Sequence, residues 1–355
     1  MAIIDKKKQI YPVSEALREY LVNQGREVAM PVRYQDLHRY QNSIPFFDAH
    51  GVDTLWETIL FGHAEMNSVH EALKKIYAHL KSAGDVSVIE HLYIDRVDLC
   101  TYGNTKPFRV RIVNKINDLF DYFYIKKADA SRVYGLELEH LISPNKINYL
   151  VSGDTLVEEH IQGIPGDEFI KNHMRDVHAN PMRLAKEFVR FNERCLVRLL
   201  GDMHSSNFVV EIIPDFDEIH YRIRAIDFDQ QSYESKRAIY MPQYFKQNNP
   251  IIELGLRRMA PELEIQYQKE ERSLIAARLR SKLFGPAIQA LVKAMIRDHI
   301  APPENVASLR QDLARLYNDN EFLACENMGE ILYTSLKFVF KYPIRHKYSF
   351  IKPSS

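Results

Sequence analysis

Two stretches decide how this sequence is interpreted: LGDMHSSNF at residues 200–208 and IDFD at residues 226–229. Asp202 and Asn207 stand five residues apart in a polar loop that follows one apolar run and leads into the next. Asp227 closes a further β-type run. Antiparallel strands on either side of such a loop can bring these side chains to one place. We therefore expect the two stretches to form a single polar site.

The residue types at this site suit the transfer of a phosphoryl group. That reaction needs a carboxylate aimed at the incoming hydroxyl, oxygen ligands for Mg²⁺, and a cation on the nucleotide phosphates. Asp202 suits the first role. Asn207 and Asp227 supply the hard oxygen ligands that Mg²⁺ prefers. Asp229 would assist the metal, since it points to the same side as Asp227 if the chain is still extended there.

Composition argues against several other classes of protein. The chain has 355 residues, and its 47 basic and 47 acidic residues give no net charge, which argues against a globally basic nucleic-acid binder. The three cysteines are too few and too dispersed for a disulfide framework or a cysteine zinc site. No leader-like apolar region and no run of about 18 apolar residues is found, which argues against secretion and membrane spanning. We expect a cytoplasmic protein.

Residues 1–84 are expected to form a helical N-terminal extension. Apolar residues recur there at helical spacing, and Gly84 is a plausible stop. These apolar positions are Leu17, Leu21, Leu55, Ile59, Leu60, Leu73, Ile76 and Leu80.

Residues 85–163 change character and are expected to form a β-rich lobe. Short runs with β propensity alternate with turns rich in Gly, Asn, Asp and Pro. One helix interrupts the series at 129–142, where an apolar stripe recurs at helical spacing. Sheet plus one helix is the predicted pattern.

Residues 164–355 are expected to form a mainly helical lobe. A helix is predicted to begin at Pro181, and helical text continues from about residue 251. A compact β insertion lies between them, with predicted strands in CLVRLL (195–200), FVVEII (208–213) and YRIRAIDFD (221–229). The fold class is therefore expected to be α+β.

The two decisive stretches resemble the catalytic loop and the metal loop of protein-kinase-like phosphotransferases. The branch of aminoglycoside phosphotransferases and choline kinases is most similar, with H-G-D-x-H-x-x-N followed by I-D-x-E/D. The matching residues are Gly201, Asp202, His204, Asn207, Asp227 and Asp229. Leu200 stands where that branch has histidine. The resemblance implies a bilobal protein-kinase-like fold, with a β-rich N-lobe and a mainly helical C-lobe, that uses ATP and Mg²⁺.

The resemblance also implies residues that bind the nucleotide. FYIK at 123–126 resembles the third-strand lysine motif, so Lys126 would contact the α- and β-phosphates, with Lys127 as the alternative. The partner glutamate should come from the following helix. Glu137 and Glu139 flank its apolar stripe at nearly equal angular distance, so periodicity barely decides between them, and Glu137 is preferred.

Two further segments are placed by the same resemblance. LVEEHIQGIPGDEF at 156–169 is similar to the hinge between kinase lobes, where the Glu159 carbonyl and the Ile161 amide would read adenine. The turn that contains Gly103 falls where a loop covers the nucleotide. It carries one glycine rather than three, which departs from the glycine-rich loop of protein kinases.

The phosphate acceptor is expected to be a hydroxyl of a small molecule. The segment at 234–250 follows the metal loop but lacks the A-P-E ending of protein kinases. Two alternatives remain. One is a pseudokinase or nucleotide-sensing interaction module, suggested by Leu200 and the sparse glycines. The other is a kinase-like enzyme that acts on a protein, including by nucleotidyl transfer.

Overall fold

The computed structural model describes residues 8–48, 50–101, 105–174, 181–216 and 218–341. The chain forms two compact units of mixed α and β structure, so the predicted α+β class is confirmed. We call Lys7–Asp129 with Ile147–His160 the sheet unit. We call Met1–Lys6, Ala130–Lys146 and Ile161–Ser355 the helical unit. No described helix is both long and apolar enough to cross a bilayer.

The sheet unit is built on one antiparallel sheet. Within the described residues its seven strands are ordered β1-β2-β3-β4-β5-β7-β6. The strands are β1 (Asn42–Phe47), β2 (Asp53–Leu60), β3 (Leu92–Cys100), β4 (Phe108–Asn114), β5 (Phe120–Lys127), β6 (Tyr149–Ser152) and β7 (Thr155–Glu159). From β1 to β5, each strand pairs with the strand that follows it in the chain. The β6–β7 hairpin then joins the sheet through β7.

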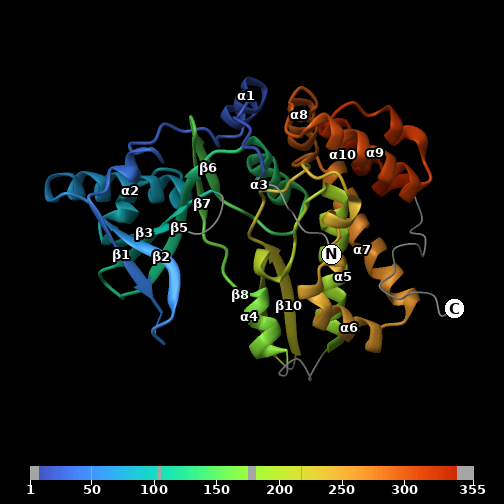
Figure 1. Cartoon of the computed structure of the whole chain (residues 1–355), viewed down its shortest axis with the longest axis horizontal. Coiled ribbons are helices and arrows are strands. Elements are labelled where there is room, and N and C mark those ends of the chain that lie inside the picture. The colour runs from blue at the N-terminus through green and yellow to red at the C-terminus, as the bar shows by residue number, and fades with distance from the viewer. Residues whose placement is uncertain (1–7, 49, 102–104, 175–180, 217, 342–355) are drawn as a thin grey trace. The chain divides into compact units, whose positions relative to one another are not determined.

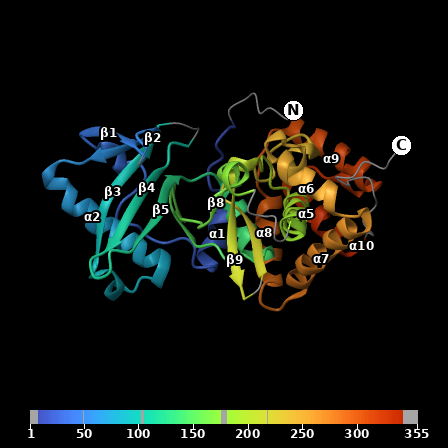
Figure 2. The ribbon, with the colours of Figure 1, turned by 90° about the horizontal axis from the view of Figure 1, so that it is seen from below.

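Helix α2 (His63–Ser82) provides the main helical contribution to the core of the sheet unit. Its predicted stripe is confirmed, because Leu73, Ile76 and Leu80 are all buried against the sheet. The helix lies along the sheet and contacts β3 (Figure 2). It ends where the sequence predicted, since Ala83 adopts a left-handed conformation and Gly84 follows with a φ of +91°. The remaining elements here are α1 (Glu15–Asn23), η1 (Asp36–Arg39) and η2 (Val86–Ile89).

The prediction that residues 1–84 form a helical extension is wrong at β1 and β2, which are strands. These two strands pair with each other, and β2 pairs with β3, so the segment extends the sheet. The spacing of Leu55 and Ile59 caused the error, because four residues fit a helical turn and also two periods of a strand. Trp56 and the β-branched residues around it are the strand signal that the sequence did contain.

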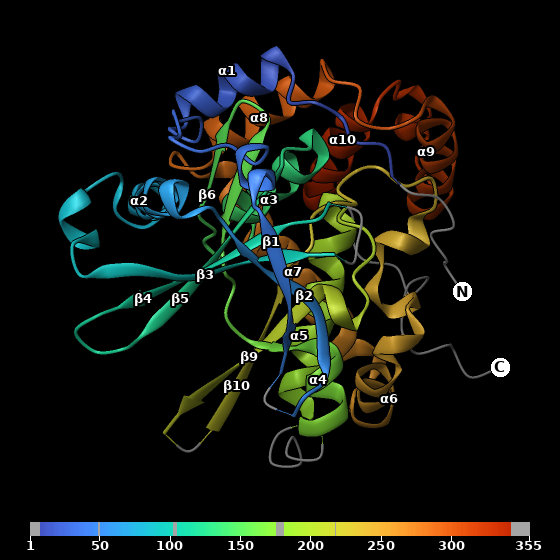
Figure 3. The same ribbon diagram turned by 60° about the vertical axis from the view of Figure 1, so that its left-hand side comes forward.

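The helical unit contains most of the helices and a small sheet. The helices are α3 (Ala130–Ile142), α4 (Gly166–Glu168), α5 (Pro181–Arg198), α6 (Asn249–Arg258), α7 (Pro261–Arg280), α8 (Gly285–Ile296), α9 (Pro303–Tyr317) and α10 (Met328–Lys341). The strands are β8 (Ile164–Pro165), β9 (Phe208–Asp215) and β10 (Glu218–Ala225), in the order β10-β9-β8. The short turns are η3 (Phe169–His173), η5 (Ser205–Asn207), η6 (Arg237–Tyr240), η7 (Pro242–Tyr244), η8 (Lys246–Asn248) and η9 (Asn320–Ala324). Figure 3 shows β9 and β10 as a hairpin.

Helix α5 is the central element of the helical unit. It lies between β10 and α7 (Figure 1) and also contacts α6 and α10. It begins at Pro181 as predicted, but the strand predicted in CLVRLL is wrong, because residues 195–198 are its last turn. Every residue from 191 to 200 is buried, so the segment has no exposed face. The short apolar run in CLVRLL has no periodicity that distinguishes a helix from a strand. Cys195 is a buried thiol of the core.

The units are divided differently from the predicted boundaries at 84 and 163. The described part of the first 84 residues belongs to the sheet unit, together with the strands that follow. Helix α3, predicted within the β-rich lobe, belongs instead to the helical unit. The last crossing between units lies between His160 and Ile161, inside the segment interpreted as a hinge.

A glycine at the contact of α10 with α8 provides a test of packing in the helical unit. A Cβ on Gly329 would lie 2.5 Å from the backbone nitrogen of Ile296. Backbone atoms cannot move aside, so Gly329→Ala should lower the free energy of unfolding by about 2–3 kcal/mol, measured by urea denaturation. Gly255→Ala is the matched control, because its Cβ would meet only Ala185 at 3.8 Å. That helical substitution should be neutral or stabilise by up to about 1 kcal/mol. Equal losses in both variants would contradict the packing argument.

Candidate functional site

The loop at 199–207 begins with a sharp reversal at the end of α5. Leu199 has a φ of +59°, and the Leu200 amide donates to the Cys195 carbonyl at 2.9 Å, which closes the helix. Asp202 is also left-handed, with a φ of +62°. Residues other than glycine seldom adopt this conformation, and such strain is concentrated at functional sites.

Backbone hydrogen bonds hold Asp202 from both sides. Its amide donates to the Ile239 carbonyl at 2.9 Å. Its carbonyl accepts from the Asn207 side-chain nitrogen at 2.8 Å and from the His204 amide at 2.9 Å. The Ile226 amide donates to the Asn207 carbonyl at 3.0 Å, which joins this loop directly to the 226–229 segment. The structure therefore brings the two decisive stretches together, as predicted.

The carboxylate of Asp202 lies in a place that disfavours its charge. Burial, followed in order of importance by the charges of Asp227, Glu234 and Asp229, raises the pKa of Asp202 to about 7. A carboxylate with a pKa near neutrality is a stronger base than one exposed to water. Glu234 was missed from the sequence, because nothing in its local pattern indicates that it approaches the loop.

Asp227 and Asp229 converge on a single cation of the protein. Nη1 of Arg132, in α3, donates to Oδ1 of Asp227 and to Oδ1 of Asp229, both at 2.8 Å. The Asp229 amide also donates to Oδ1 of Asp227 at 3.0 Å. The strand predicted at 221–229 is too long, because β10 ends at Ala225 and residues 226–229 are not in a strand. The extended chain that was to place Asp229 beside Asp227 is therefore absent, although both acids share this contact. Arg132 was missed, because a lone basic residue in a predicted helix carries no local sign of its partner.

The side chains at this point have the donor chemistry that Mg²⁺ requires. Asp227 and Asp229 provide carboxylate oxygens and already bind one cation, the guanidinium of Arg132. Asn207 provides an amide oxygen. No cluster of three or more His, Cys, Asp or Glu side chains suited to a metal is found in the described residues. Only Asp227 and Asp229 in this set are of those four residue types, because the third donor is the amide of Asn207. Mg²⁺ commonly completes its shell with water and substrate phosphates.

Two other positions of the motif contribute to the loop itself. The ring of His204 accepts from the Ser206 amide at 3.3 Å, a contact within the loop itself. Burial lowers the pKa of His204. Leu200, which replaces the usual histidine, is fully buried and forms an isolated bridge with Gln231. The Gln231 side chain donates to the Arg198 carbonyl, so a glutamine supports the start of this loop.

The structure gives Glu139 a structural role. Its carboxylate pairs with Arg198 and accepts from Ser143 at 2.6 Å and from Asn145 at 2.9 Å. Burial alone would raise the pKa of Glu139, but Arg198 and these hydrogen bonds hold it below the usual range. Glu137, the preferred partner for Lys126, is also buried, with 2% of its surface exposed.

Removing the charge of Glu139 should test that role. Glu139→Gln leaves the buried Arg198 guanidinium uncompensated, so unfolding should become easier by about 3 kcal/mol in a denaturant titration. The control is Glu253→Gln, which breaks an exposed pair with Arg257 and should cost less than about 0.5 kcal/mol. A small loss in both variants would argue against a structural pair at Glu139.

In the sheet unit, Lys126 lies in β5 as predicted and is nearly buried. Its Nζ donates to Oε2 of Glu158, on the neighbouring strand β7, at 2.9 Å. Lys127, the alternative, is exposed. Sequence reasoning missed Glu158, because strand pairing rather than helical spacing brings it to the lysine.

The other residues assigned to the nucleotide are placed as follows. The Glu159 side chain accepts from the Asn148 amide at 2.7 Å within the sheet unit. Ile161 belongs to the helical unit and is 8% exposed. Gly103, assigned to the loop over the nucleotide, lies outside the described residues.

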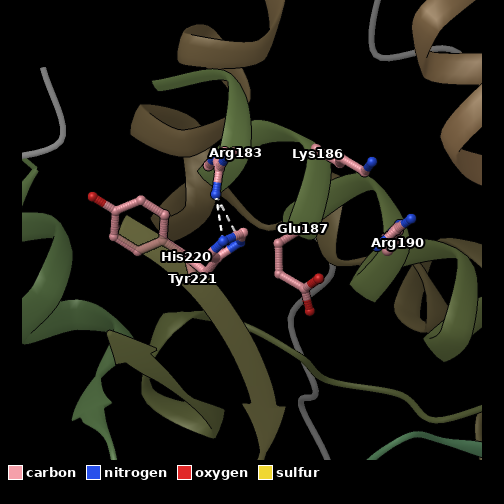
Figure 4. Close-up of a pocket in the computed structure, with 6 residues that line it drawn as sticks. All are labelled: Arg183, Lys186, Glu187, Arg190, His220 and Tyr221. Atoms are coloured by element: carbon pink, nitrogen blue, oxygen red, sulfur yellow. Dashed lines mark hydrogen bonds between the residues drawn. The ribbon is translucent and has the colours of Figure 1, made fainter. Parts of the chain in front are cut away.

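A separate pocket of about 340 Å³ lies beside the first half of α5 (Figure 4). Its lining residues are Arg183, Lys186, Glu187, Arg190, His220 and Tyr221. Acids of the protein already accompany much of this positive charge. Glu270 on α7 pairs with Lys186 and Arg190. The pocket residues offer no carboxylate pair and no strained loop comparable to those around Asp202. We therefore place the candidate site at Asp202 and not in this pocket.

No protein-family model matches this sequence, and a search of curated proteins finds no significant match.

Proposed function

We propose that this chain is an ATP- and Mg²⁺-dependent phosphotransferase that moves the γ-phosphoryl group to a hydroxyl, with a small molecule as acceptor. One observation carries the proposal: a left-handed Asp202, with its pKa raised to about 7, is held by Asn207 and lies beside Asp227 and Asp229. This is the set of groups that the resemblance to kinase-like enzymes assigns to the reaction.

In the proposed reaction Asp202 accepts the proton of the acceptor hydroxyl as its oxygen bonds to the γ-phosphorus. The bond from that phosphorus to the β,γ-bridging oxygen breaks, and ADP leaves. Asn207, Asp227 and Asp229 would hold Mg²⁺, which when bound supplies positive charge next to the phosphate oxygens. Lys126, with Glu137 as its assigned partner, would neutralise phosphate charge. The Glu159 carbonyl and Ile161 amide remain the proposed contacts to adenine, and Gly103 belongs to the proposed covering loop.

The test is an assay of the full chain with ATP and Mg²⁺ against a panel of hydroxylated metabolites. ADP formation should depend on one class of acceptor, and mass spectrometry should show a gain of one phosphoryl group on it. Omitting Mg²⁺ should abolish the reaction. Nucleotide binding without turnover on any acceptor would favour the alternative of a pseudokinase or nucleotide sensor. A mass gain on a protein would favour a protein acceptor, and its size would separate phosphoryl from nucleotidyl transfer.

A further inference from the structure

Arg132 is the cation that the structure places against both acids of the 226–229 segment. Its side chain is 3% exposed, whereas those of Asp227 and Asp229 are 37% and 22% exposed. Its contacts use Oδ1 of each acid. The guanidinium therefore contacts both carboxylates from the buried side.

The first half of α3 is fastened to the same segment by two further contacts. Ser131 Oγ donates to the carbonyls of Asp229 and Gln231, at 3.2 and 2.6 Å. A Cβ on Gly135 would lie only 2.9 Å from Cβ of Phe228, so the helix approaches as closely as a glycine permits. Arg132 thus sits on a backbone that is packed against its partners, and withdrawing it would leave a buried charge.

The charge of Arg132 has a consequence for metal binding. Arg132 offsets about one unit of the negative charge that Asp227 and Asp229 carry together. A divalent cation is attracted in proportion to that charge, and Mg²⁺ gives up its water reluctantly. The phosphates of a nucleotide would supply the missing negative charge and further oxygen ligands.

We propose that Arg132 is a positioning residue that orients Asp227 and Asp229 and keeps the affinity of the nucleotide-free protein for divalent cations low. The metal then enters as its complex with the nucleotide. This inference rests on the proposed function for its nucleotide, but the effect of Arg132 on metal affinity is measurable without any turnover.

The experiment is a titration of the nucleotide-free full chain with Mn²⁺, in which electron paramagnetic resonance measures the free ion. Wild type should bind Mn²⁺ only in the millimolar range. Arg132→Met should bind at least about tenfold more tightly, because it removes one positive charge next to the site. Arg132→Lys should stay near wild type, since it keeps the charge. Adding Asp227→Asn to Arg132→Met should abolish the gain. A purely structural role for Arg132 predicts no gain in affinity.

Two results would overturn the inference. One is unchanged Mn²⁺ affinity in an Arg132→Met variant whose circular dichroism and cooperative unfolding match wild type. The other is micromolar Mn²⁺ binding by wild type itself, a measurement that needs no variant to fold. Either result together with ATP turnover would leave the proposed function standing. Suppose that the Mn²⁺ affinities of wild type and variants are as expected, but the protein neither binds nor turns over ATP. The proposed function would then be refuted, and the role of Arg132 in metal affinity would remain.

Discussion

Asp202→Asn is expected to lower kcat by about 10²–10⁴-fold while changing the affinity for Mg²⁺–ATP only a few-fold. An amide cannot accept the proton of the acceptor hydroxyl, whereas its size and polarity match the carboxylic acid. Asparagine also tolerates the left-handed backbone at this position, where φ is +62°. Steady-state kinetics with the acceptor found in the metabolite panel, and equilibrium binding of the nucleotide, measure the two quantities separately.

The same substitution should change how stability depends on pH in the metal-free protein. The pKa of Asp202 is raised to about 7 by burial and then by Asp227, Glu234 and Asp229, against about 3.9 in an unfolded chain. The folded state therefore holds this proton more tightly, so the contribution is present below about pH 4 and is lost as pH rises to about 7.

Asp202→Asn should accordingly be more stable than wild type by about 1–3 kcal/mol at pH 8, with a smaller difference at pH 5. Urea denaturation at the two pH values, with chelator present, gives both numbers. If the free energy of unfolding of wild type and of Asp202→Asn depended on pH in the same way, this would contradict a raised pKa of the Asp202 carboxylate in the folded protein. It would also weaken the case for Asp202 as the base.

Asp227→Asn is expected to weaken Mg²⁺-dependent nucleotide binding by at least about tenfold, and turnover should fall with it. The substitution keeps an oxygen that can accept from Arg132 and from the Asp229 amide, so the local structure should survive. What it removes is the negative charge. Isothermal titration with ATP, in the presence and absence of Mg²⁺, separates metal-dependent from metal-independent affinity.

The matched control is Asp215→Asn, which removes the same charge from a side chain 60% exposed at the end of β9. It should leave nucleotide affinity within about twofold, because an exposed charge at a distance is screened. Equal loss of nucleotide binding in Asp202→Asn and Asp227→Asn would contradict the division of roles between base and metal ligand.

Local patterns predicted the elements whose polar and apolar faces differ. The stripe of α2 and the β9–β10 hairpin are confirmed for this reason. The bounds of α3 are also confirmed, from helical spacing alone, although all its residues except His140 are buried. Two other elements were predicted wrongly. The end of α5 is buried on all sides, and β1 and β2 carry an apolar spacing that suits a helix as well as a strand.

The residues of the candidate site also differ in how far local sequence indicates them. Asp202, Asn207 and Asp227 were found because spacing within one loop and one strand end is written in the local sequence. Arg132 and Glu234 were not, since their approach depends on how distant segments pack. Contacts between residues far apart in the chain produce no periodic pattern in the sequence, so their partners can be identified only from the structure.

The two units interrupt one another along the chain, and this limits how the protein can be dissected. Strand β5 pairs with β7, but ribosomal synthesis must complete α3 before β7 exists. Truncation at any single peptide bond near residue 129 or 160 would separate strands or helices that belong to the same core. A fragment that ends near residue 129 should be aggregation-prone, because β5 loses its partner β7. A fragment that ends at residue 160 keeps the strands of the sheet unit but separates α3 from the helices that it packs against, α7 and α8.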